Sequence, residues 1–158
     1  MSNVNIEAFL NTSHQLQTAI AGLEESELKW KQAPEIWSVQ EVISHLVDHS
    51  IVVSFRIRDI LAGTKVQLPA FNQDAWVSGQ YSNEGNLSDV LITFEALLYY
   101  NGLLIRRLNS ADLAKTGINP KGETVSISQI IAGFTNHLQN HLGQIERIQQ
   151  AKAAQAIH

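Results

Sequence analysis

Residues 126–148, SISQIIAGFTNHLQNHLGQIERI, form the most regularly patterned stretch of this 158-residue chain. Apolar side chains recur there at three- and four-residue steps, which is the period of an amphipathic helix. The stretch also carries His137 and His141, one helical turn apart, so that both imidazoles can face one object. Two ligands do not complete a metal site, so a third ligand must come from elsewhere in the chain.

The same helix-start signal occurs twice. Ser38 and Glu41 have the spacing of a capping box, in which each side chain bonds the other residue's backbone N–H group. Ser126 and Gln129 repeat this spacing in front of the patterned stretch. The two signals predict helices that begin at Ser38 and at Ser126, and the first of these is expected to end at Gly63.

Two more amphipathic patterns complete the expected architecture, over residues 5–22 and 86–109. Residues 64–85 form a long crossover. Such a long connection is uncommon in a compact domain unless it has a function, such as covering a site. In residues 110–125 a brief extended pair is compatible with the sequence without being required. Four helices joined by long crossovers predict an all-α four-helix bundle, built as a single domain over residues 1–158.

Composition narrows the classes of function. The net charge is −4 and no basic cluster is present, so we expect no nucleic-acid partner. Neither a secretory leader nor an apolar run of about 18 residues can be identified, so we expect no membrane span and a cytoplasmic protein. The chain has no cysteine, so His, Asp or Glu must hold any metal. The low charged fraction of 16% suggests surface that a second subunit covers, as in a homodimer.

The third ligand is sought in WSVQEVISHLVDH, residues 37–49, which carries a second His-x-x-x-His pair. On a helical wheel, His49 lies about 70° and His45 about 110° from the centre of the apolar stripe. Periodicity therefore slightly favours His49, and spacing leaves the choice open. The competing interpretation is that these histidines are half-buried structural residues at helix flanks.

Three imidazoles with one open coordination position would make a site of the catalytic type. Such a donor set suits zinc or nickel best, with iron or manganese as further options. The bound ion would lower the pKa of a water molecule or polarise a substrate. The sequence does not distinguish attack by water from attack by a thiol that arrives with the substrate.

Residues 37–49 resemble the helix-two signature of the DinB-like metalloprotein superfamily, and HLQNHLGQI, residues 137–145, resembles its C-terminal signature. FNQDAW, residues 71–76, and Tyr81 stand in the order seen in family members, as does the glycine-containing loop before the last helix. The resemblance implies a DinB/YfiT-like four-helix bundle that binds a divalent metal. The ligands that it implies are His45, His137 and His141, so it overrides the preference for His49.

The family resemblance also implies the kind of chemistry. Members include thiol transferases that use bacillithiol or mycothiol, a maleylpyruvate isomerase and metal-dependent hydrolases, and many are homodimers. We therefore expect a small-molecule substrate, with a low-molecular-weight thiol as one option. The bacillithiol branch has Ser followed by His after the aspartate, whereas this chain has His49 followed by Ser50, and this departure weakens assignment to that branch.

Two further polar residues are candidates for the catalytic machinery. Asp48 could orient a ligand or a metal-bound water, and the equal alternative is an exposed helix carboxylate. Gln144, next to His141, could hydrogen-bond within the site or be a surface glutamine. Glu95 as a general base is a minority interpretation, and so is a site-lining role for Asp74 in the crossover.

Three functions follow from these residues. The leading hypothesis is a metal-dependent hydrolase or thiol transferase. The second is a non-catalytic dimeric binding or stress-response module that keeps the fold and the metal. The third is a purely structural bundle in which every histidine is a boundary residue.

Overall fold

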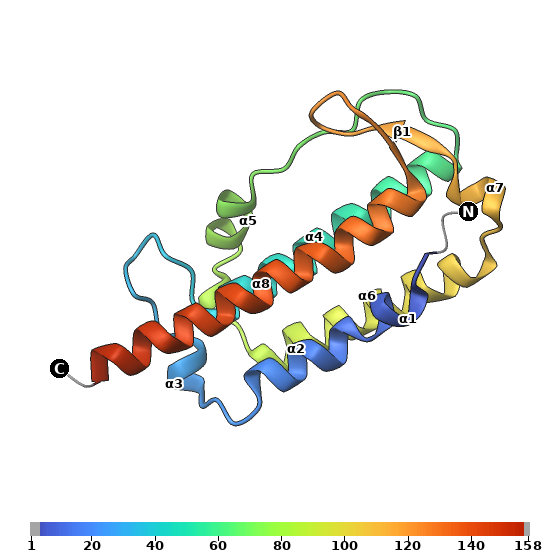
Figure 1. The fold of residues 1–158 in the computed structure, drawn as a ribbon. Coiled ribbons are helices and arrows are strands. Elements are labelled where there is room, and N and C mark those ends of the chain that lie inside the picture. The colour runs from blue at the N-terminus through green and yellow to red at the C-terminus, as the bar shows by residue number, and fades with distance from the viewer. Residues whose placement is uncertain (1–3, 157–158) are drawn as a thin grey trace.

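A computed structural model describes residues 4–156 as a bundle of long helices that lie side by side (Figure 1). One column consists of two consecutive helices, and each of the other three is a single long helix. They are α1 (Ile6–Leu10) with α2 (Thr12–Ile20), α4 (Val39–Leu61), α6 (Leu87–Arg107) and α8 (Ile127–Ala156). The predicted four-helix bundle with long crossover connections is therefore confirmed.

The four columns enclose one apolar core. Helix α4 packs against α6 and α8, and the α1–α2 column packs against the same two helices from the opposite side. Three phenylalanines meet at the centre, where the ring centroid of Phe134 lies 4.9 Å from that of Phe9 and 6.4 Å from that of Phe94. Helix α8 thus packs against the α1–α2 column and also against α4.

The two predicted capping boxes are present. Ser38 Oγ accepts the backbone N–H of Glu41 at 3.1 Å, and Glu41 Oε1 accepts the backbone N–H of Ser38 at 3.0 Å. Ser126 and Gln129 form the same reciprocal pair at 3.1 and 2.8 Å. Because these bonds satisfy backbone donors that have no partner inside the helix, they set where α4 and α8 begin.

The first column differs from the prediction of one helix over residues 5–22. It is interrupted at Asn11, between α1 and α2. Thr12 Oγ1 donates a 2.7 Å hydrogen bond to the carbonyl oxygen of Phe9, and a side chain that bonds the backbone in this way competes with regular helical pairing. The column still ends where expected, before Gly22, whose φ of +80° suits glycine.

The crossover after α4 contains structure of its own and is attached to the bundle at several points. It includes α5 (Gln73–Gly79) and the 3₁₀ turn η1 (Ser82–Glu84). Leu68 donates its backbone N–H to Ile118 at 2.9 Å. Gln40 on α4 donates to the carbonyl oxygens of Ser82 and Gly85 at 3.0 and 2.8 Å. The crossover therefore lies along one side of the bundle as a fixed cover.

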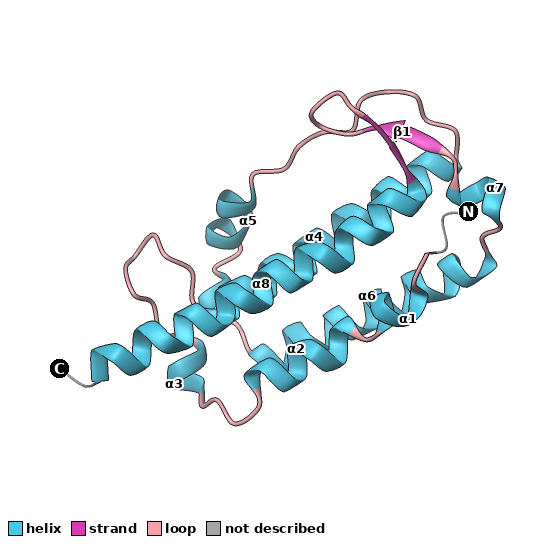
Figure 2. Cartoon of the chain, in the orientation of Figure 1, coloured by secondary structure: helices cyan, strands magenta, loops and turns pink. Residues whose placement is uncertain are grey.

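The optional extended pair before α8 is formed. After the short helix α7 (Ser110–Leu113), strand β1 (Thr116–Ile118) pairs antiparallel with β2 (Thr124–Ser126), as Figure 2 shows in magenta. A short helix, α3 (Glu25–Leu28), precedes α4. Within the described residues, α6 alone has the length and apolar composition of a membrane span, and core helices of bundles pass the same test.

Candidate metal centre

Three histidines from two helices converge between α4 and α8. His45 Nε2 lies 3.3 Å from His137 Nε2, and His141 Nε2 lies 3.0 Å from the same atom. The ligand atoms of all three lie within 4.8 Å of one another. The structure thus brings together the three residues that the family resemblance implied, from helices far apart in the sequence.

His45 is completely buried, although the helical wheel placed it away from the apolar stripe of α4. The reason is that residues 38–48 are buried on every side of the helix. His49 lies beside the cluster, with its ring centroid 3.9 Å from that of His137 and its ring stacked on Phe134 at 5.7 Å. It is not one of the three converging ligands.

Two of the nitrogen separations suit a tetrahedral ion. Zinc binds imidazole nitrogen at about 2.0–2.1 Å, and the corners of such a tetrahedron are about 3.3 Å apart. The separations of His137 Nε2 from His141 Nε2 and His45 Nε2, 3.0 and 3.3 Å, are close to that value, and all three ligand atoms lie within 4.8 Å of one another. Three protein ligands leave one corner for a further group, which is the arrangement of catalytic sites.

Burial keeps these imidazoles neutral. Desolvation, with electrostatic repulsion from His141 as the second cause, lowers the pKa of His45 to about 3 and that of His137 to about 4. Burial also lowers the pKa of His141, against the opposing effect of its hydrogen bond to Gln144. Neutral imidazole is the form that binds metals, so the cluster is ready to bind an ion at neutral pH.

The second nitrogen of each ring differs in its surroundings. His141 Nδ1 lies 2.7 Å from Gln144 Oε1. The Nδ1 atoms of His45, His49 and His137 are buried with no hydrogen-bond partner among residues 4–156. A carbonyl oxygen only accepts, so His141 carries its proton on Nδ1 and directs the lone pair of Nε2 into the cluster.

Aromatic side chains wall the site on the crossover side. Phe71 stacks over His45 with ring centroids 6.3 Å apart, and Trp37 lies 5.0 Å from His45. Trp76 on α5 meets Phe71 edge-on at 5.0 Å. The contact of Phe71 with His45 was not predicted from the sequence. The FNQDAW motif within the long crossover was the available signal.

Asp48 is buried, with 3% of its surface exposed, and it is not a member of the histidine cluster. Its Oδ2 accepts a 3.0 Å hydrogen bond from Gln80 Nε2, which also donates to the carbonyl oxygen of Trp76 at 3.0 Å. It lines a pocket of about 260 Å³ that Asp89 and Thr93 of α6 border as well. Burial raises the pKa of Asp48, and the bond from Gln80 partly opposes this.

The two minority candidates lie elsewhere. Glu95 accepts hydrogen bonds from Ser13 and Gln17, which places its carboxylate between α6 and the α1–α2 column. Asp74 is exposed on α5. Neither belongs to the group of ligand atoms around His45.

The chain is a helical bundle whose second and fourth long helices bring three imidazoles together, an arrangement that could hold a metal ion. The chain belongs to the DinB superfamily, whose model matches residues 8–145.

Relatives and solved structures agree with this assignment. A protein from Geobacillus thermodenitrificans, named "Putative metal-dependent hydrolase", is 24% identical over 139 residues, which cover 87% of this chain and 78% of the relative. A protein of the same description from Bacillus licheniformis is 25% identical over 134 residues, covering 84% and 76%.

Two solved structures share the fold. YfiT from Bacillus subtilis, described as a probable metal-dependent hydrolase with an unusual four-helix bundle topology, superposes with a TM-score of 0.84 at 18% identity over 94% of this chain and 85% of its own. A mycothiol-dependent maleylpyruvate isomerase superposes with a TM-score of 0.72 at 11% identity over 89% of this chain and 58% of its own.

Proposed function

We propose that this protein is a divalent-metal-dependent enzyme, either a hydrolase or a thiol transferase, whose ion is held by His45, His137 and His141. The observation that carries the proposal is the convergence of three neutral imidazoles, one buried and two half-buried, whose ligand atoms lie within 4.8 Å of one another. When bound, the ion supplies Lewis-acid chemistry that activates water or a thiol for attack on an electrophile. Relatives named as metal-dependent hydrolases support the assignment.

The donor set favours particular ions. Imidazole suits zinc and nickel, and it also accepts iron, whereas manganese prefers oxygen ligands. No cysteine is present to select a softer ion. Zinc or nickel is therefore the proposed cofactor, with iron and manganese as the less favoured options.

Two polar residues are proposed to support the triad. Gln144 fixes the ring of His141 by accepting a hydrogen bond from its Nδ1–H group. Asp48 does not contact the triad. It accepts a hydrogen bond from Gln80, and Gln80 in turn bonds the last turn of α5, so Asp48 fixes the position of that helix. That helix carries Trp76, which packs on Phe71 above His45.

The proposed substrate is a small molecule. A pocket of about 430 Å³ lies between α4 and the crossover, and Phe71 and Trp76 line it. This volume falls in the range of small-molecule sites, about 300–1,000 Å³. The fold shared with a mycothiol-dependent isomerase supports a low-molecular-weight thiol as cosubstrate, while the order of His49 and Ser50 weakens assignment to the bacillithiol branch.

The proposal treats residues 1–158 as one domain of a cytoplasmic homodimer. Large apolar side chains are exposed on neighbouring helices α4 and α6, and surfaces of this kind mark protein interfaces. They are Ile51, Phe55, Ile92, Tyr99, Tyr100 and Leu103.

A non-catalytic binding module is the second candidate. It is favoured by one observation, namely that no Asp or Glu among residues 4–156 joins the histidine cluster to act as a base. Under this alternative the protein keeps the ion and binds a ligand without turning it over.

Metal analysis tests the proposal. Inductively coupled plasma mass spectrometry of tag-free protein should find about one divalent ion per chain, and little or none in His45→Ala, His137→Ala or His141→Ala. His14→Ala is the matched control, because His14 is an exposed histidine on α2. Undiminished metal in the three variants would refute the site. A metal-loaded protein that binds but never turns over ester, amide or thiol-acceptor substrates would favour the binding module.

A further inference from the structure

Arg56 is a half-buried cation with few protein partners. Its Nη2 donates a 3.2 Å hydrogen bond to the carbonyl oxygen of Pro69. Among residues 4–156 the salt bridges involve Lys29, Lys31 and Lys115, and none involves Arg56. A guanidinium group has five N–H donors and ordinarily pairs with an anion when it is buried.

Arg58, two residues further along α4, has a guanidinium group with several hydrogen-bond partners. Arg58 Nη1 donates to Ser54 Oγ at 2.7 Å and to Asn101 Oδ1 at 2.8 Å, and its guanidinium lies 4.6 Å from the ring centre of Tyr100. Arg58 therefore serves the packing of α4 against α6. Arg56, on another face of α4, has no comparable set of contacts within the described chain.

Arg56 faces the same way as the histidines of α4. It follows His49 by seven residues and His45 by eleven, which is close to two and three full helical turns. Helical side chains lean toward the N-terminus of their helix, so Arg56 leans back toward His49 from about 10 Å further along the axis. The positive charge of Arg56 contributes to lowering the pKa of His49.

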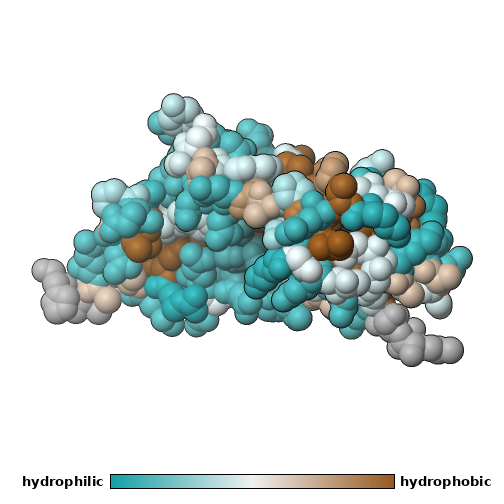
Figure 3. All heavy atoms as spheres, turned by 90° about the horizontal axis from the view of Figure 1, so that it is seen from above, coloured by the Kyte–Doolittle hydropathy of each residue, from teal (hydrophilic) through white to brown (hydrophobic). Residues whose placement is uncertain are grey.

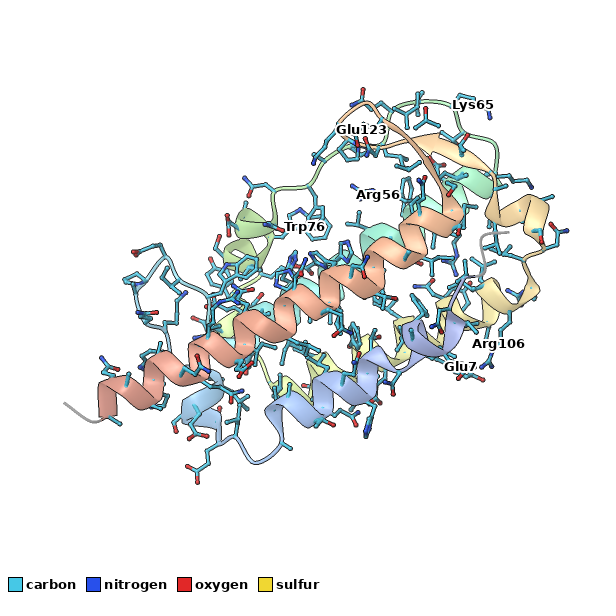
Figure 4. All side chains as sticks on the ribbon, in the orientation of Figure 1. Glu7, Arg56, Lys65, Trp76, Arg106 and Glu123 are labelled. Atoms are coloured by element: carbon cyan, nitrogen blue, oxygen red, sulfur yellow. The ribbon has the colours of Figure 1, made fainter. Side chains whose placement is uncertain are left out.

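A single pocket joins this cation to the wall of the metal centre. Its volume is about 430 Å³. Arg56 supplies its one charged side chain, and the walls are mainly Ile51, Val52, Phe55, Pro69, Phe71 and Trp76. Figure 4 shows Arg56 of α4 and Trp76 of the crossover on the same side of the bundle. Figure 3, which looks onto this side, shows apolar patches set in a mainly hydrophilic surface.

Phe71 belongs to both sites. Its side chain lines the pocket, and its ring also stacks on His45 of the triad. The lining of the pocket includes Phe71 and none of the three histidines, so a ligand bound beside Arg56 would be separated from His45 by the Phe71 ring. Its body would lie against apolar walls, and its anionic end would lie at the guanidinium.

We propose that Arg56 binds a carboxylate of the substrate, so that this protein acts on small organic acids with an apolar or aromatic body. The inference rests on the proposed metal-dependent function and specifies its substrate class. A planar guanidinium binds carboxylate or phosphate through paired N–H donors. One guanidinium neutralises one charge, and a phosphate monoester dianion would bring a second charge into an apolar pocket, where an unpaired charge is strongly disfavoured. A monoanionic carboxylate matches the pocket.

Binding measurements test the inference without relying on turnover. Isothermal titration calorimetry would compare 3-phenylpropionate, the neutral 3-phenylpropionamide and phenyl phosphate, with both metal-loaded and chelator-treated protein. Hydrogen bonds to a charged group predict that Arg56→Gln weakens 3-phenylpropionate binding by about 10- to 100-fold. The neutral amide should bind the wild type and Arg56→Gln equally. Arg56→Lys should restore part of the affinity.

Arg106→Gln is the matched control, because it removes the same charge from an exposed position in the last turn of α6. It should leave all three affinities unchanged. Unaltered far-ultraviolet circular dichroism of Arg56→Gln would show that the variant is folded.

Three outcomes would overturn the inference. One is 3-phenylpropionate binding that is equal in the wild type and in Arg56→Gln. The second is 3-phenylpropionate binding that is lost on chelator treatment but is unchanged in Arg56→Gln, because the carboxylate would then be a metal ligand. The third is tighter, Arg56-dependent binding of phenyl phosphate, which would assign the pocket to phosphate esters. Arg56-dependent binding of the acid in a protein that never takes up metal would support the inference while refuting the proposed function.

Discussion

His141 Nδ1 lies 2.7 Å from Gln144 Oε1, three residues further along α8. The amide oxygen accepts a hydrogen bond from the imidazole Nδ1–H, so Gln144 selects the tautomer of His141. Within residues 4–156 this is the only Nδ1 of the triad with such a partner, since those of His45 and His137 have none. Gln144 is therefore the one polar group whose removal should change metal affinity without removing a ligand.

Gln144→Ala is expected to weaken metal binding by about 10- to 100-fold, the usual effect of losing a hydrogen-bond partner of a ligating histidine. Competition with a chromophoric chelator measures this affinity. Gln139→Ala is the matched control, because Gln139 lies on the same helix but bonds Gln15 instead. Equal affinities for the two variants would contradict the role of Gln144.

The stability of the metal-free protein should fall as the pH is lowered from about 6.5 toward 4. Folding lowers the pKa of His45 to about 3 and that of His137 to about 4, from an ordinary value of 6.5. Between these values the unfolded chain binds protons that the folded chain does not, so the free energy of unfolding declines with falling pH. Each fully titrating histidine contributes up to about 1.4 kcal/mol per pH unit.

Urea denaturation at pH 7.5, 6 and 5 checks this dependence. The variant His45→Asn should show a shallower decline, because one of the titrating groups is gone. A free energy of unfolding that is constant over this pH range would contradict the prediction.

Asp48→Asn is expected to make the protein at least as stable as the wild type at pH 7. Burial raises the pKa of Asp48, so its ionised form is disfavoured in the fold, and this penalty disappears as the pH falls below the folded-state pKa. The asparagine oxygen can still accept the bond from Gln80. Asp48→Ala removes that bond and should lower the free energy of unfolding by about 1 kcal/mol.

Thermal and urea denaturation of the two Asp48 variants would distinguish charge from hydrogen bonding. If Asp48→Asn were as destabilising as Asp48→Ala, the carboxylate charge itself would be stabilising. The proposed positioning role predicts in addition that Asp48→Ala, more than Asp48→Asn, changes the intrinsic fluorescence of Trp76 above the site.

Two helical glycines should respond differently to alanine. A Cβ at Gly133 on α8 would meet nothing within 4 Å, so Gly133→Ala should stabilise the protein by about 0.5–1 kcal/mol. A Cβ at Gly102 on α6 would lie 2.8 Å from Leu10 Cδ2. The Leu10 side chain must shift to admit it, so Gly102→Ala should stabilise the protein less than Gly133→Ala. Differential scanning calorimetry of both variants measures the difference, and equal shifts would contradict the close packing of α6 against α1.

Much of the fold could be predicted because its signals are local. Reciprocal capping at Ser38 and Ser126 needs only residues three positions apart, and apolar periodicity needs only one helix at a time. His137 and His141 were found for the same reason. The interruption at Asn11 was not predicted. It accompanies a hydrogen bond from the Thr12 side chain to the backbone of Phe9, and apolar periodicity carries no information about such a bond.

The rest of the site depends on contacts between distant segments. A helical wheel assumes that one face of a helix meets solvent, but the first half of α4 is covered on all faces, so the wheel misplaced His45. The roles of Phe71 and Arg56 arise where the crossover lies against α4, and the crossover has no period from which its path could be predicted. Only the resemblance to a family selected His45.

The distance in sequence between α4 and α8, which carry the three histidines, affects the order of events during synthesis. His45 and His137 are separated by 92 positions, and the triad is complete only with His141, one helical turn further on. A nascent chain therefore exposes His45 long before its partners have left the ribosome. Under the proposed function, metal loading would have to wait until the final helix docks, when translation is almost finished.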